Sequence, residues 1–175
     1  MPDLQNEAGV SYGSLQQWSE PLRVGVQCHH AADGVFHDLP VFLEGSRALT
    51  RDLLERGVPR GAARAVGHAG WELLLDGLLI QDDALITGYF AALRVEVADL
   101  DWRTALERRA ARGVPTYYAE PTRVAELLRR ILSYRRLLAF DREHVTSVTE
   151  ALANAQTHVA ASAASVFAAV MPTDD

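Results

Sequence analysis

Histidine and carboxylate side chains recur at four-residue intervals in two short windows of the chain. The members of the two windows are, in order, His29, Asp33 and His37, then His68, Glu72 and Asp76. An α-helix advances about 100° per residue, so each four-residue step turns the side chain by only about 40°. If both windows are helical, each places its three side chains on one helix face.

Imidazole and carboxylate groups are ligands for divalent cations, and helical bundles build metal sites from inward-facing His, Asp and Glu. We therefore expect the two faces to bind a divalent metal, either Mn, Fe, Zn or Mg. A structural hydrogen-bond network is the alternative. Among the six residues, Asp76 gives the strongest indication of a metal or another compensating partner, because it interrupts the apolar run from Leu73 to Leu79, which we expect to be buried. An unpaired charge there would be very costly.

The elements that carry these windows are expected to be helices. Ala and Leu dominate the apolar residues and favour helix, whereas β-branched residues are too scattered to form strands. We predict an all-α fold, a compact bundle of about seven helices. The helices are expected from residue 19 or 22 to 36, from Asp38 as N-cap to 55, from 60 to 80, from an Asp82 or Asp83 cap past 93, from an Asp99 or Asp101 cap to 112, from 122 to 140 and from 141 to 170.

The length and composition suggest one domain over residues 1–175, with residues 1–18 as a loosely ordered lead-in. The formal charge of −6 argues against a nucleic-acid partner, which would need a positive surface. The single Cys28 excludes an internal disulfide. We see no signal peptide, and the most apolar late stretch is too short to span a bilayer, so we expect a cytoplasmic protein with no membrane partner.

The first window resembles a motif of the bacterial acyl carrier protein phosphodiesterases, a divergent branch of the HD-domain-like metal hydrolases. Gly25, His29, Asp33 and Pro40 match that motif, and His37 stands where the family has Asp. In the second window, Glu72 and Asp76 fall on the family's two acidic positions, and His68 is an additional ligand-type residue. The chain departs from the pattern at Leu39 and Gly77, where the family has His, and it lacks the family's N-terminal motifs.

The resemblance implies an HD-domain-like, metal-dependent phosphohydrolase in which metal-activated water attacks a phosphoester. Six protein ligands would fill one octahedral ion, so either two metals share them or some of them act as a base. His30 and Glu72 are the candidate catalytic bases. The implied partner is a phosphorylated substrate, with acyl carrier protein as one option.

Arg123 and Arg130 lie seven residues apart and would face the same way on a helix, where they could bind phosphate or an acidic protein. The alternative is a solvated face that pairs with Glu126 and other acids. Tyr117, in the loop before them, is a candidate for the rim of a substrate pocket. A different class of function also stays open, namely a non-catalytic helical protein that binds a metal or a small ligand. Small residues in the final helix would permit a homodimer.

Overall fold

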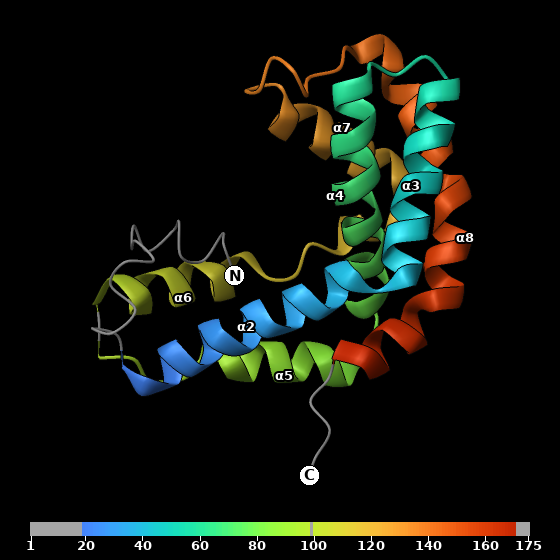
Figure 1. Ribbon diagram of the computed structural model, residues 1–175. Coiled ribbons are helices and arrows are strands. Elements are labelled where there is room, and N and C mark those ends of the chain that lie inside the picture. Colours follow the sequence, from blue (N-terminus) through green and yellow to red (C-terminus); the bar gives the residue numbers. More distant parts are fainter. Residues whose placement is uncertain (1–18, 99, 171–175) are drawn as a thin grey trace. The chain divides into compact units, whose positions relative to one another are not determined.

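The computed structural model describes residues 19–98 and 100–170 (Figure 1). These residues form seven α-helices and no strand, which confirms the predicted all-helical fold. The helices are α2 (Glu20–Asp38), α3 (Pro40–Glu55), α4 (Arg60–Leu79), α5 (Asp83–Leu93), α6 (Leu100–Arg112), α7 (Pro121–Leu132) and α8 (Val145–Val170), with two short 3-10 helices, η2 (Thr116–Ala119) and η3 (Arg142–His144). None of the described helices has the length and apolarity needed to cross a membrane.

Several helix ends lie where the local sequence signals place them. Asp82 is the N-cap of α5, and its carboxylate accepts hydrogen bonds from the backbone N–H groups of Ala84 and Leu85. Helix α4 begins at Arg60, directly after the Gly57 turn, where the backbone has a positive φ of 80°. Helix α6 begins at Leu100, so the predicted Asp99 cap and the predicted lead-in of residues 1–18 lie outside the described residues.

Two predicted boundaries are wrong for local reasons. Asp38 is the last residue of α2 and not the N-cap of α3, because the residue before Pro40 is forced into extended backbone and Leu39 takes the cap position. Helix α7 ends at Leu132 and does not continue to residue 140. Beyond Leu132 the chain continues in turns, with the backbone N–H of Arg135 donating to the carbonyl of Leu132 and that of Leu138 donating to the carbonyl of Arg135.

Backbone contacts divide the chain into two compact units. Among the described residues, the first comprises 19–34, 82–98 and 100–114, and the second 35–81 and 115–170. In the first unit, α5 contacts α6, and a small core forms around the buried Trp102 and Val26. A single domain over residues 1–175 stays a prediction, and each unit is described below by itself.

The core of the second unit lies among α3, α4, α7 and α8. Helix α7 illustrates the pattern, since Val124, Ala125, Leu128 and Leu132 recur at helical spacing and are all buried. On α4, a Cβ at Gly67 would collide with the Thr50 side chain, and a Cβ at Gly70 would lie 2.8 Å from a methyl carbon of Leu152. These two glycines therefore allow α3 and α8 to approach α4 closely.

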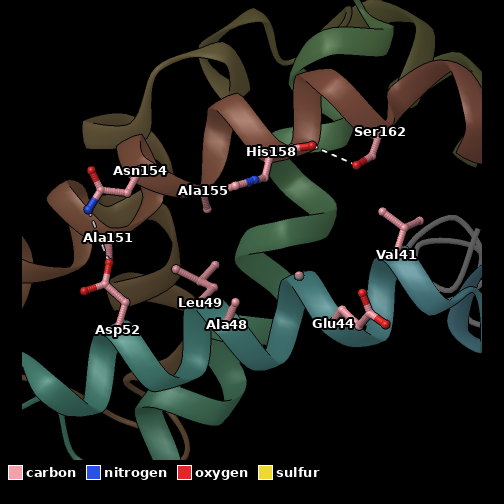
Figure 2. A pocket seen from close by; sticks show the side chains of 11 residues that line it. Val41, Glu44, Ala48, Leu49, Asp52, Ala151, Asn154, Ala155, His158 and Ser162 are labelled. Carbon is pink, nitrogen blue, oxygen red and sulfur yellow. Dashed lines mark hydrogen bonds between the residues drawn. The ribbon is translucent and has the colours of Figure 1, made fainter.

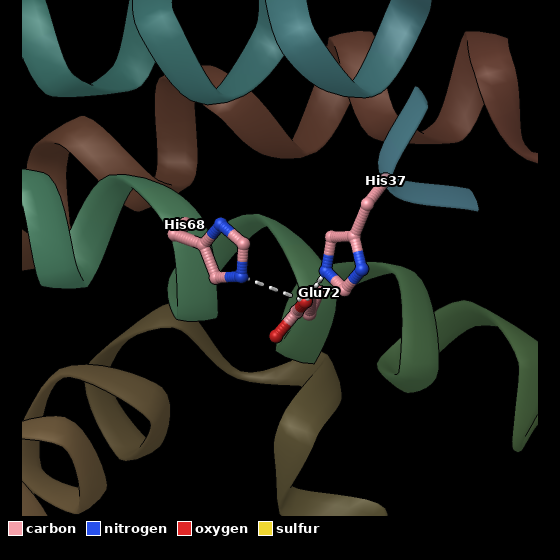
Figure 3. A group of neighbouring side chains, drawn as sticks. All are labelled: His37, His68 and Glu72. Carbon is pink, nitrogen blue, oxygen red and sulfur yellow. Dashed lines mark hydrogen bonds and ion pairs between the residues drawn. The ribbon is translucent and has the colours of Figure 1, made fainter. Parts of the chain in front are cut away.

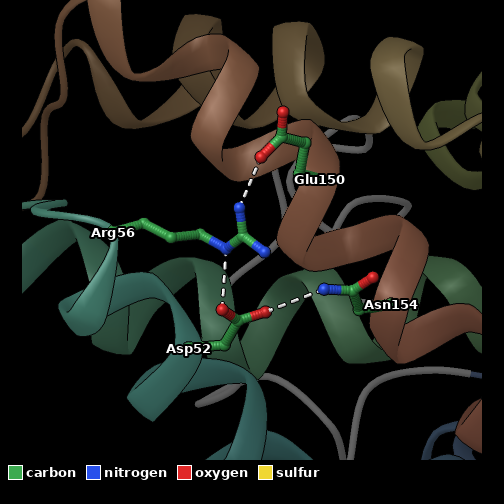
Figure 4. A network of polar contacts seen from close by, with 4 residues as sticks. All are labelled: Asp52, Arg56, Glu150 and Asn154. Carbon is green, nitrogen blue, oxygen red and sulfur yellow. Dashed lines mark hydrogen bonds and ion pairs between the residues drawn. The ribbon is translucent and has the colours of Figure 1, made fainter.

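A polar network joins α3 to α8 near the end of α3 (Figure 4). The guanidinium of Arg56 donates to the Asp52 carboxylate at 2.7 Å and also to Glu150. The other Asp52 oxygen accepts a hydrogen bond from the Asn154 amide at 3.3 Å. The hydrogen bond with Asp52 is the main cause that raises the pKa of Arg56. The network fixes α3 against α8 in the same unit that contains the candidate site.

Candidate metal centre

Three of the predicted ligand residues, His37, His68 and Glu72, converge in the second unit (Figure 3). The Oε1 atom of Glu72 lies 2.8 Å from Nε2 of His37 and 3.2 Å from Nε2 of His68. The two imidazole rings are stacked, with centroids 5.0 Å apart and an interplanar angle of 11°. One ligand atom from each residue lies within 4.8 Å of the others, so the three residues could bind one cation. His37 and Glu72 are also at hydrogen-bond distance.

The local fold explains how these three side chains meet. His68 and Glu72 are four residues apart on α4 and so lie on one helix face. His37 comes from the last turn of α2, just before Leu39 becomes extended and the chain turns into α3. The buried ring of Phe42 packs against both imidazoles, at 5.0 Å from His37 and 5.1 Å from His68. This ring holds the two histidines side by side.

The donor set and its spacing fit a divalent cation. Two His and one carboxylate are the protein ligands of several catalytic zinc sites, and they are also a set used for non-haem iron. Ligand atoms about 2.0–2.1 Å from a cation lie about 2.8–3.4 Å from one another at octahedral or tetrahedral angles. The Glu72–His68 separation of 3.2 Å falls within this range, and the Glu72–His37 separation of 2.8 Å, which is also that of a hydrogen bond, lies at its lower end.

The group is accessible from solvent. The His68 side chain is 54% exposed, that of Glu72 33% and that of His37 29%. A cation bound by these three residues would keep coordination positions that no described ligand fills, because a tetrahedral or octahedral ion needs four or six ligands. With three protein ligands, the ion would keep open positions for water or substrate, which six protein ligands on one octahedral ion would not leave.

Asp76 is exposed, so its predicted burial is wrong. The next residue, Gly77, faces the core instead, where a Cβ would lie 2.5 Å from the carbonyl oxygen of Tyr118. Asp76 is also eight residues from His68, which corresponds to about 12 Å along the helix axis. A single ion cannot bind both ends of such a triplet, and Asp76 is not part of the converging group.

In the first window, His29 and His37 are also eight residues apart, too far along α2 for one ion to bind both. His29 and Asp33 lie on the part of α2 that belongs to the first unit, and His37 lies on the part that belongs to the second. Neither His29 nor Asp33 is in the converging group. Burial lowers the pKa of His29, an effect partly opposed by Asp33. His30 is exposed in the first unit with its ring 5.6 Å from that of His29, and its role as a base stays a prediction.

The predicted substrate-binding residues Tyr117, Arg123 and Arg130 line one surface cavity of about 740 Å³ in the second unit. Within it, Arg123 lies 3.6 Å from Glu120, and Arg129 pairs with Glu126 at 3.0 Å. Arg130 has no ion-pair partner among the described residues. The pairs of Arg123 with Glu120 and of Arg129 with Glu126 are what the solvated-face alternative expects, and binding of an anion by Arg123 and Arg130 stays a prediction.

A second cavity, of about 380 Å³, was not anticipated from the sequence (Figure 2). It lies between α3 and α8, with Leu49 and Ala155 in its apolar wall and with Glu44, His158 and Ser162 among its polar residues. Its volume is in the range of small-ligand pockets. The cavity could not be predicted from the sequence around His158, because its neighbours across the cavity come from a helix more than a hundred residues earlier in the chain.

Comparison of the chain with protein-family models, with curated proteins and with solved structures finds no match. The candidate site therefore rests on its own geometry and on the motif resemblance described above.

Proposed function

We propose that this protein is a metal-dependent phosphohydrolase whose metal centre is formed by His37, His68 and Glu72. The observation that supports it is the convergence of two imidazole nitrogens and one carboxylate oxygen, all within 4.8 Å, at a solvent-accessible point of the second unit. The resemblance of the two windows to the acyl carrier protein phosphodiesterases favours a phosphoester substrate. Acyl carrier protein itself is one candidate partner from that resemblance.

In this proposal, Nε2 of His37, Nε2 of His68 and Oε1 of Glu72 hold the cation. A divalent cation bound there lowers the pKa of water and polarises a phosphoryl oxygen. Phe42 fixes the orientation of both imidazoles. Arg130, Arg123 and Tyr117 line a cavity that includes none of the three ligand residues, and their part in binding an anionic group of the substrate stays a prediction from the sequence.

Metal analysis of the purified protein is the first test, followed by hydrolysis of bis-p-nitrophenyl phosphate with added Mn, Zn or Mg. We expect His68→Ala and Glu72→Gln to lose bound metal and hydrolysis together. His158→Ala is the matched control, because His158 is an exposed histidine of the same unit and is not in the group. It should keep both the metal and the activity.

Asp76→Ala and His29→Ala distinguish the three-residue centre from the six-ligand arrangement that the sequence suggested. Neither variant should change the metal content, since neither residue belongs to the converging group. Bound metal without hydrolysis of any phosphoester would favour the non-catalytic alternative. If no metal binds, and chelation leaves the melting temperature unchanged, the proposal is wrong and the three side chains form a hydrogen-bond network only.

A further inference from the structure

The segment that follows α7 presents apolar side chains to solvent. Tyr134 is 87% exposed, Leu137 is 79% exposed, and Ile131 in the last turn of α7 is 46% exposed. Isolated exposed apolar residues are ordinary on protein surfaces. Here three exposed apolar residues fall within seven positions of the chain, and such a concentration is typical of an interaction site.

The same segment is strongly basic. Residues 127–140 contain four Arg and no Asp or Glu, in a chain whose formal charge is −6. Arg129 pairs with Glu126, but Arg130, Arg135 and Arg136 are exposed and have no ion-pair partner within the described part of the chain. We call the three apolar residues and these three arginines the 130–137 surface.

The fold holds this surface in place. The backbone N–H of Arg135 donates to the carbonyl of Leu132 at 2.9 Å, and that of Leu138 donates to the carbonyl of Arg135 at 2.8 Å. The Leu137 carbonyl packs so closely on α4 that a Cβ at Gly61 would collide with it. Phe140, which is only 6% exposed, anchors the end of the segment in the core. These contacts fix the backbone of the segment in the conformation that exposes Tyr134 and Leu137.

We propose that the 130–137 surface binds the headgroup region of an anionic lipid membrane. Interfacial binding combines aromatic and aliphatic side chains that enter the headgroup boundary with Arg side chains that attract anionic lipids. Such binding needs no membrane-spanning helix, and a chain without a spanning segment can still bind at the headgroup layer. The proposal does not depend on the proposed metal centre. Arg130 also lines the cavity assigned above to the substrate, so the variants below change only residues that do not line that cavity.

A lipid surface fits better than a protein partner. A stable protein interface buries about 800 Å² on each side, more than three side chains supply. Side chains as exposed as Tyr134 and Leu137 project from the surface, so they do not line a groove that could accept a partner's side chain. A fluid headgroup layer accommodates such projections without a matching pocket.

Flotation of the full chain with lipid vesicles tests the proposal, with no metal added. Wild type should bind vesicles of mixed phosphatidylcholine and phosphatidylglycerol, and should bind pure phosphatidylcholine vesicles much more weakly. The double variant Arg135→Gln/Arg136→Gln should lower the affinity by about fivefold for each charge removed. Added salt should weaken wild-type binding, because it shortens the range of the attraction.

Tyr134→Ser/Leu137→Ser should also weaken binding, but its residual binding should keep the dependence on anionic lipid. The matched control is Arg51→Gln/Leu54→Ser on α3, which removes an exposed arginine and a 43% exposed leucine from another helix of the same unit. This control should bind as wild type does. Circular dichroism melting of each variant shows whether it is folded.

Three results would overturn the proposal. The first is that wild type does not bind anionic vesicles, and the second is that it binds neutral vesicles equally well. The third is that the folded 130–137 variants bind anionic vesicles as strongly as wild type does. A concentration-dependent dimer that disappears in Tyr134→Ser/Leu137→Ser, without vesicle binding by wild type, would assign the surface to a second copy of the chain. Capture on polyglutamate, again without vesicle binding, would assign it to an acidic protein.

Discussion

Truncation of Phe42 tests whether the aromatic cluster holds the candidate metal centre together. Phe42 on α3 is 2% exposed, and its ring lies 4.6 Å from that of Phe36, 5.0 Å from His37, 5.1 Å from His68 and 5.5 Å from Trp71. Loss of a buried Phe side chain to Ala costs about 3–5 kcal/mol. Because the ring is fully buried and touches four other rings, we expect Phe42→Ala to lose about 4 kcal/mol.

Leu49→Ala is the matched control for this experiment. Leu49 is 3% exposed, belongs to the same core and lies seven residues further along α3, on the same helix face. Its truncation should cost about 3 kcal/mol, from the range of 2–5 kcal/mol for buried leucines. Phe42→Leu keeps an apolar side chain and should lose about 1.5 kcal/mol or less. Free energies of unfolding come from urea titrations followed by circular dichroism.

Zinc binding by Phe42→Leu and Leu49→Ala tests whether the Phe42 ring positions the two histidines. In wild type, zinc at about a hundred times its dissociation constant should raise the free energy of unfolding by about 2.7 kcal/mol. Phe42→Leu should lose part of this gain, since His37 and His68 lose the ring that orients them, whereas Leu49→Ala should keep it. A cost below about 1.5 kcal/mol for Phe42→Ala would refute the reasoning about the cluster. Equal zinc stabilisation in Phe42→Leu and wild type would show that the ring does not position the histidines.

Three further predictions concern single positions. Gly77→Ala should lower the free energy of unfolding by about 1–3 kcal/mol in urea titrations, because its Cβ would lie 2.5 Å from the Tyr118 carbonyl oxygen. Gly88→Ala in α5 is the control and should raise it by about 1 kcal/mol, because a Cβ there meets nothing within 4 Å. Equal effects of the two substitutions would contradict this prediction. Burial lowers the pKa of His29 in the folded chain, so the unfolded chain takes up the proton first as pH falls below 6.5, and stability drops. His29→Gln should therefore make the melting temperature decline less steeply at low pH. An unchanged pH profile of the melting temperature in this variant would count against the prediction. Asp82→Ala removes the N-cap hydrogen bonds of α5 and should cost about 1 kcal/mol, whereas Asp82→Asn should cost less.

Local signals in the sequence were sufficient to locate most of the helices. Proline at the first position of α3 and of α7, and the Asp82 cap of α5, act on neighbouring residues and need no tertiary contact. The pairing of His68 with Glu72 was predictable for the same reason, since a four-residue step on a helix brings two side chains together wherever the helix packs. The end of α7 was missed, because residues 133–140 contain no Gly or Pro that would mark a break.

Tertiary packing decided which of the predicted ligands meet. Periodicity shows that residues share a helix face, but it does not show which way that face turns. On α4 the close approach of Gly77 to Tyr118 turns that residue to the core, which leaves its neighbour Asp76 exposed, although the apolar run around it suggested burial. His37 joins His68 and Glu72 only because the chain turns at Leu39 and packs Phe42 beneath both imidazoles. Helix rotation and chain direction depend on contacts between residues distant in sequence, so the sequence supplied the candidates and the fold selected among them.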